Sequence, residues 1–179
     1  MSILLILTLV AGTIYGADRH LPFWLANPPD AVDRVIVDKQ ARQLYLMHQG
    51  KAVRHYSMGM GKNPENHKVQ EGDSRTPEGT YTLDWRNPNS RFFRSLHISY
   101  PNTQDKATAE AKGVSPGGAI MIHGAPNGLG WLPGILPTGD WTDGCIAVTN
   151  AEMAEIWQSV VDGTPIEIHA SLSNPPSLE

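Results

Sequence analysis

Short runs of β-branched, aromatic and aliphatic residues, bounded by turn residues, recur along most of this chain and restrict its fold more than any other feature. Such runs are typical of β-strands. They predict strands at residues 34–38, 43–47, 51–60, 79–84, 96–100, 119–123, 145–149 and 165–169. The second and third runs flank His48-Gln49-Gly50, which predicts a hairpin. We therefore expect a mostly β domain built as an antiparallel meander.

Two segments interrupt the strands with a helical pattern. Residues 103–112 are polar and rich in alanine and end at Gly113, which suits a surface helix with a glycine C-cap. The second helix begins after Thr149, an expected N-cap with Glu152 three residues on. An apolar stripe follows and should pack on the sheet: Met153, Ile156, Trp157, Val160 and Val161. The strand at 145–149 therefore leads directly into a helix.

The first 17 residues contain an apolar run, Ile3 to Val10, that is shorter than the roughly 20 residues a membrane span requires. It matches the central region of a signal peptide, so we expect an exported, periplasmic protein. Residues before the run include no Lys or Arg, and the small residues near Gly16 and Ala17 fit a cleavage site poorly. An uncleaved N-terminus that tethers the protein to the membrane is the alternative.

The rest of the chain divides by composition. Residues 18–33 contain three prolines and no sustained period, so they are interpreted as a linker to a domain at 34–170. Residues 171–179 are expected to form a disordered tail. The hydrophobic content of 40% supplies a core without a disulfide or a metal. The net charge of -4, with no run of Lys or Arg, argues against a nucleic-acid partner.

Cys145 is the only cysteine, so it has no partner for an intramolecular disulfide. An inert buried thiol is one interpretation, and a catalytic nucleophile is the other. A nucleophilic thiol needs a base, and His123 at the end of an expected strand is the best candidate. Gly124 permits close backbone approach there, and Gly144 leaves the sulfur accessible. Backbone N–H groups of Asp143, Gly144 and Cys145 are candidates for an oxyanion hole.

A long loop rich in Gly, Pro and Trp separates His123 from Cys145. Loops of this kind often cover binding sites, so Trp131 and Trp141 either close over a substrate or bury their rings beneath the loop.

Arg75 and His97 are two further candidates outside that loop. The guanidinium of Arg75 either meets a substrate carboxylate or fixes its own loop through Asp73 or Glu78. His97 alternates within an expected strand and is either structural or lines the substrate site.

Two motifs together resemble a known family. Ile122-His123-Gly124 followed by Thr142-Asp143-Gly144-Cys145 is similar to the signature of the YkuD-type L,D-transpeptidases. Residues 72–79 and 95–102 resemble the Gram-negative, YafK-like branch of that family. The resemblance covers most of residues 34–170. It implies a mixed or antiparallel β-sheet sandwich with one or two packed helices and a long active-site loop.

The resemblance also implies a thiol enzyme that acts on peptidoglycan stem peptides without a metal or organic cofactor. Cys145 would attack the carbonyl between an L-centre and a D-residue, at meso-diaminopimelate, and form a thioester. His123 would take the thiol proton and then activate the acceptor, with its ring oriented by the Gly124 carbonyl. An amine acceptor would give a cross-link or lipoprotein attachment, and water would give carboxypeptidase or amidase activity. The candidate substrate-binding residues are Arg75, His97, Trp131, Trp141 and Thr142.

The chain departs from the common motif at two positions. Asp143 stands where most members have a second histidine, and Ala147 stands where Asn or Arg is usual. Asp143 could orient His123, bind a substrate amine or cap its own loop.

Two other classes of function stay open on the sequence. One is a non-catalytic cell-wall-binding module in which Cys145 is vestigial. The other is a metallohydrolase that uses His97, His123, Asp143 and Cys145, whose spacing differs from the compact helical zinc motifs.

Overall fold

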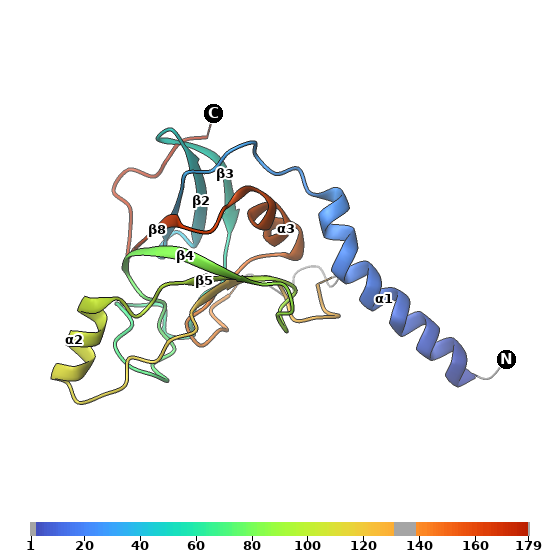
Figure 1. The fold of residues 1–179 in the computed structure, drawn as a ribbon, viewed down its shortest axis with the longest axis horizontal. Helices are drawn as coiled ribbons and strands as arrows, with labels where there is room; N and C mark the ends of the chain where they lie inside the picture. Colours follow the sequence, from blue (N-terminus) through green and yellow to red (C-terminus); the bar gives the residue numbers. More distant parts are fainter. Residues whose placement is uncertain (1–2, 131–138, 179) are drawn as a thin grey trace.

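A curled, mixed β-sheet dominates the computed structural model, which describes residues 3–130 and 139–178 (Figure 1). Within this part of the chain the sheet has eight strands in the order β3-β2-β1-β8-β4-β5-β6-β7. Their bounds are β1 Arg34–Asp38, β2 Gln43–His48, β3 Lys51–Ser57, β4 Gly79–Asn87, β5 Ser95–Ile98, β6 Met121–His123, β7 Ile146–Ala147 and β8 Thr164–His169. The predicted mostly β fold is confirmed, with each expected strand present and several of them shorter.

The strand order is not the simple meander expected from the sequence. β8, from the end of the chain, lies between β1 and β4 and pairs parallel to the first and antiparallel to the second. β6 and β7 also pair in parallel, across the long connection between them. The antiparallel meander is therefore wrong in the centre of the sheet, because the apolar alternation of β8 specifies a strand but not its neighbours.

Two helices match their predicted positions. α2 spans Thr103–Ala111 and α3 spans Asn150–Ser159, and each begins with a capping box. Met153, Ile156 and Val160 at α3 pack into the principal core with buried side chains from the sheet. Val161 is exposed, so its expected place in the apolar stripe is wrong: the helix ends at Ser159, and the chain turns away.

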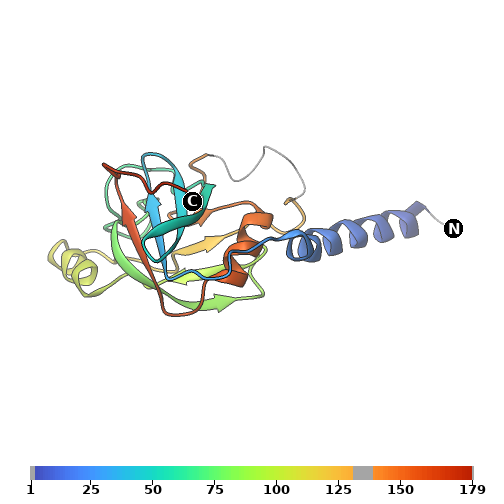
Figure 2. The same ribbon diagram turned by 90° about the horizontal axis from the view of Figure 1, so that it is seen from above.

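The N-terminal segment forms a helix that crosses the expected boundary between signal and linker. α1 spans Ile3–Leu25 and includes Pro22. Its N-terminal part extends away from the sheet, while its C-terminal part lies beside α3 (Figure 2). The expected linker is therefore wrong for residues 18–25, and residues 26–33 are irregular. Pro22 was one of the prolines that indicated a linker, but in the structure it lies inside the helix and does not end it. Among the described residues, no helix combines the length and the hydropathy that a membrane span needs.

The C-terminal tail lies against the domain at two points. The Leu172 N–H donates a hydrogen bond to the Asp38 carboxylate at 3.1 Å. Leu178 forms an isolated β-bridge with Ala52. The expectation of a disordered tail is therefore wrong for these residues, which short-range sequence patterns could not reveal because both partners are distant in the chain.

Candidate active site

The register of two short parallel strands brings Cys145 close to His123. Ile122 pairs with Ile146 and His123 with Ala147, so Cys145 immediately precedes β7 while His123 ends β6. Ile122 of β6 and Ile146 of β7 are buried in the core, which anchors the two candidate side chains. Groups that must meet with precision are best held on such rigid elements.

Both side chains line one cavity with a volume of about 410 Å³. Segment 87–95, strand β6 and the turn before β7 form its walls. The other lining residues include Asn87, Ser90, Arg91, Phe92, Met121 and Trp141. The sequence-predicted pair therefore shares a concave site large enough to take part of a peptide.

The ring of His123 is tightly held. Its Nδ1 lies 2.7 Å from the Gly124 carbonyl oxygen, which can only accept, so Nδ1 carries the proton and a neutral ring leaves Nε2 as the acceptor. Phe92 and Trp141 pack on the ring at centroid distances of 4.6 and 5.7 Å. Burial lowers the pKa of His123, and the Gly124 hydrogen bond offsets part of that effect. The imidazole is thus neutral at neutral pH and able to accept a proton.

The thiol of Cys145 is half-buried and protonated at rest. Burial raises its pKa, a backbone hydrogen bond from Met121 opposes that rise, and Asp143 adds to it. Sγ lies 3.7 Å from the carbonyl oxygen of Ala119, a residue with a positive φ of 55°. A thiol in this environment needs a base at the moment of attack rather than a standing thiolate.

The turn that presents Cys145 is built around Thr142. The Thr142 hydroxyl donates to the Cys145 carbonyl at 2.7 Å and accepts from the Gly144 N–H at 3.2 Å. Its backbone bonds to Met60 and Lys62. Thr142 lines the cavity, but its hydroxyl is engaged in the turn, and its contact with a substrate stays a prediction. The Gly144 N–H is likewise engaged within the turn, which leaves the Asp143 and Cys145 amides as the candidate oxyanion donors.

A glycine is required immediately before Cys145. Gly144 has a φ of +125°, and a Cβ there would lie 2.5 Å from the Arg75 carbonyl oxygen. The loop carrying Arg75 is itself fixed by Asp73. Although burial raises the pKa of Asp73, the Lys68 ammonium and three backbone N–H groups lower it to about 2. The thiol turn therefore rests on a rigid loop from another part of the chain.

Gly144→Ala is expected to destabilise the fold by at least about 1–3 kcal/mol and to impair Cys145 reactivity. The methyl group adds a backbone clash to an unfavourable φ, and relief of the clash must move the thiol. Denaturant unfolding and thiol alkylation measure the two effects. Gly163→Ala is the matched control, since Gly163 has a φ of +95° and open space around its Cα. Equal losses in the two variants would contradict the role given to the Arg75 contact.

Asp143 lies at the exposed rim of the cavity. Its carboxylate pairs with the Lys62 ammonium at 2.8 Å and lies 3.4 Å from the Ser74 hydroxyl. The hydrogen bond from Lys62 lowers the pKa of Asp143, which is therefore ionised at neutral pH. Of the three roles considered for Asp143, these contacts do not support orientation of His123, because the His123 Nδ1 is held by the Gly124 carbonyl. Lys62 was missed in the sequence because it is distant from the motif.

Other predicted site residues lie elsewhere. His97 pairs with Asp84 at 2.6 Å and stacks on Trp85, away from the cavity lining. Arg75 lines a separate depression, and its Nε is buried without a hydrogen-bond partner among the described residues. Trp131 lies outside the described residues. In the described ranges no group of three or more His, Cys, Asp or Glu side chains is arranged to hold a metal.

Phe92 is the main cavity residue that the sequence analysis overlooked. Its ring lies 4.6 Å from His123 and 6.0 Å from Trp141, so the three form a cluster at the site. Phe92 lies three residues before β5 and belongs to no recognisable motif. The only sequence feature that pointed to it was the neighbouring segment 95–102, which was used for the family resemblance alone.

The comparison with protein families gives one match that covers most of the domain. The sequence model of the L,D-transpeptidase catalytic domain, YkuD, matches residues 32–168. YafK of Escherichia coli (strain K12), described only provisionally as an L,D-transpeptidase, is 31% identical over 125 residues. The alignment covers 68% of this chain and 40% of YafK. The chain therefore spans well under half the length of the curated relative it matches.

Solved structures share the fold. The helical cell shape determining protein Pgp2 from Campylobacter jejuni superposes with a TM-score of 0.61 at 25% identity, over 91% of this chain and 56% of Pgp2. An L,D-transpeptidase from Xylanimonas cellulosilytica gives a TM-score of 0.54 at 17% identity, over 80% of this chain and 63% of the other. The second likeness is one of fold alone.

Proposed function

Because the chain belongs to the L,D-transpeptidase catalytic domain family, we propose that it transfers acyl groups of peptidoglycan stem peptides through a thioester on Cys145. One observation carries this proposal: His123 ends β6, Cys145 immediately precedes its parallel partner β7, and both residues line the same cavity. A non-catalytic wall-binding module has no use for this arrangement, because an accessible thiol invites oxidation. The catalytic function is thus favoured over the binding module.

The first half-reaction forms the thioester. His123 Nε2 takes the thiol proton as Sγ attacks the carbonyl between the L-centre of diaminopimelate and the following D-residue. The negative charge on the carbonyl oxygen is stabilised by the amides of Asp143 and Cys145. The C–N bond then breaks, and the imidazolium returns its proton to the leaving amine. The terminal D-residue departs, and the acyl group stays on sulfur.

The second half-reaction depends on the acceptor. A side-chain amine of another stem peptide loses its proton to His123 as it attacks the thioester. The C–S bond then breaks and the imidazolium returns the proton to the Cys145 sulfur, which gives a cross-link and the free thiol; the amine of a lipoprotein gives attachment in the same way. Water gives hydrolysis instead, as an L,D-carboxypeptidase or in lipoprotein release. Asp143 at the cavity rim is already paired with the Lys62 ammonium, so its charge does not select the acceptor. Membership of the L,D-transpeptidase family places transpeptidation first and hydrolysis second, with no cofactor in either reaction.

The proposed location is the periplasm, the compartment that contains the proposed peptidoglycan substrate. The apolar start of α1 supports export, either through a removed signal or as a tether. Pgp2 is a determinant of helical cell shape, and by analogy we propose a role in cell-wall remodelling and cell shape for this chain.

The test is product analysis after mixing the full chain with diaminopimelate-containing muropeptides. We expect dimers whose mass equals two substrates minus one released free D-amino acid, together with an acyl adduct on intact protein. Protein whose single thiol has been blocked with iodoacetamide is the control. Loss of the D-residue without dimers would assign hydrolysis, and dimers that persist after blocking would overturn the thioester route.

A further inference from the structure

One peptide unit connects the candidate catalytic histidine to a second set of buried groups. The carbonyl of the Gly124–Ala125 peptide accepts the His123 Nδ1 proton at 2.7 Å. The N–H of the same peptide unit, on Ala125, donates to Asn150 Oδ1 at 2.9 Å. Because a peptide unit is planar, a group that holds its N–H also fixes the direction of its carbonyl. Asn150 therefore controls the acceptor that orients His123.

Asn150 is clasped between two glycines. It is the first residue of α3, and 3% of its surface is exposed. A Cβ on Gly124 would lie 2.6 Å from Asn150 Oδ1, and one on Gly130 would lie 2.0 Å from Asn150 Nδ2. The loop that follows His123 therefore packs its backbone directly on this side chain. Gly124 therefore has two roles: its missing side chain leaves room for Asn150, and its carbonyl accepts the His123 hydrogen bond.

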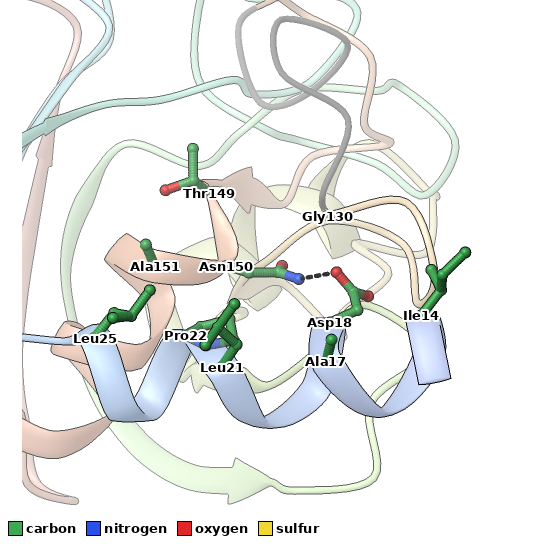
Figure 3. Close-up of a pocket in the computed structure, with 10 residues that line it drawn as sticks. All are labelled: Ile14, Ala17, Asp18, Leu21, Pro22, Leu25, Gly130, Thr149, Asn150 and Ala151. Atoms are coloured by element: carbon green, nitrogen blue, oxygen red, sulfur yellow. Dashed lines mark hydrogen bonds between the residues drawn. The ribbon is translucent and has the colours of Figure 1, made fainter. Parts of the chain in front are cut away.

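Asp18, from α1, fixes the orientation of the Asn150 amide. Asp18 Oδ1 accepts from Asn150 Nδ2 at 3.1 Å (Figure 3). Asp18 Oδ2 accepts from the Gly128 N–H at 2.7 Å. A carboxylate offers acceptors alone, so the Asn150 NH₂ group must face Asp18 and its oxygen must face Ala125. If the amide were flipped, the Asn150 NH₂ group would face the Ala125 N–H, and the Asn150 oxygen would face the Asp18 carboxylate.

Anchoring of α1 does not by itself explain an acid at this position. Asp18 is 6% exposed, and these two partners are uncharged N–H groups. Among residues 3–130 and 139–178 no cation pairs with this carboxylate. Burial of a carboxylate without a countercharge is costly, and an apolar side chain would dock a helix at lower cost. Phe23 already stacks on Phe93 at 5.4 Å, and Arg19 bonds the Pro88 carbonyl. The acid is better explained by what it orients.

We infer that Asp18 and Asn150 are positioning residues for the catalytic histidine, acting through the Gly124–Ala125 peptide. The inference rests on the proposed Cys145 and His123 pair. The negative charge of Asp18 polarises the Asn150 amide and then the peptide, which strengthens the Gly124 carbonyl as an acceptor. That acceptor stabilises the imidazolium formed when His123 takes the thiol proton. The part of α1 that carries Asp18 thus becomes part of the catalytic unit.

Reactivity of the single thiol with iodoacetamide, measured against pH on the full chain, tests the inference without any peptidoglycan substrate. Asp18→Asn places two amides face to face, and Asn150→Asp places two carboxylates together. In each single variant one hydrogen bond of the chain is lost, and alkylation near neutral pH should slow roughly 10- to 100-fold. The double variant Asp18→Asn with Asn150→Asp restores every hydrogen bond and retains one carboxylate. It should recover most of the wild-type rate.

Controls separate the outcomes. Asp30→Asn makes the same chemical change at an exposed site and should leave the rate unchanged. If His123→Ala slows alkylation but Asp18→Asn does not, the positioning role is overturned and the catalytic pair stands. If His123→Ala leaves the rate unchanged, the catalytic pair itself fails. A double variant that reacts as slowly as the single variants, or unfolds more readily than they do, also overturns the inference.

Discussion

Cys145→Ala is expected to remove both acyl-enzyme formation and product, with a loss of at least roughly 1,000-fold in kcat/KM. The thiol is the group that would carry the acyl chain, and the chain has no second cysteine to replace it. Intact-mass measurement after incubation with muropeptides should show an adduct on the wild type and none on the variant. A carbapenem, which the family resemblance implies as an acylating agent, should give the same contrast.

The substitution should cost little stability, so that lost activity reports lost chemistry. The Cys145 side chain is half-buried, and its thiol interacts with the backbone through a hydrogen bond from Met121 and a 3.7 Å contact with the Ala119 carbonyl. Denaturant unfolding of the two proteins should therefore agree closely. Residual product from folded Cys145→Ala would show that the thioester is not on the reaction path, and an adduct on the variant would place the nucleophile elsewhere.

Local patterns in the sequence were enough to predict most elements of the fold. Thr149 and Glu152 form the expected capping box, and strands such as β1 and β2 follow directly from their apolar runs. The position of β8 between β1 and β4 could not be predicted from the sequence, because the neighbours of a strand in a sheet depend on tertiary packing. α1 was not predicted as a helix, and residues 18–25 were interpreted as a linker, because the C-terminal part of α1 is stabilised by contacts with distant segments such as Phe93.

The candidate site shows the same division. Cys145, His123 and Gly124 stand in recognisable motifs, and the structure brings them together. Asn150 and Asp18 carry no motif, since one is an ordinary helix-start asparagine and the other lies in the segment interpreted as a linker. The inferred role of Asp18 depends on hydrogen bonds to residues more than 100 positions away in the sequence. Such contacts are visible only in the folded chain.

His123→Ala is expected to lower kcat/KM roughly 100- to 10,000-fold, the usual contribution of a general acid–base group. Burial raises the pKa of the Cys145 thiol, so little thiolate exists at neutral pH without a base. The kcat/KM of the variant should rise with pH in the alkaline range, because hydroxide then deprotonates the thiol. His97→Ala is the matched control, since that ring pairs with Asp84 away from the cavity lining. A comparable loss in His97→Ala would contradict the assignment of the base.

The pH profile supplies a second criterion with a defined sign. Burial lowers the pKa of His123 below its ordinary value of 6.5, so the neutral base persists as the pH falls through that value. Wild-type kcat/KM should stay level down to a pH below 6.5 and then decline as the imidazolium forms, since a protonated ring cannot accept the thiol proton. His97→Ala should keep this acid limb, and His123→Ala should lose it. An acid limb above pH 6.5 would mean that the ring is stabilised in its charged form, and the thiol would then react as a standing ion pair.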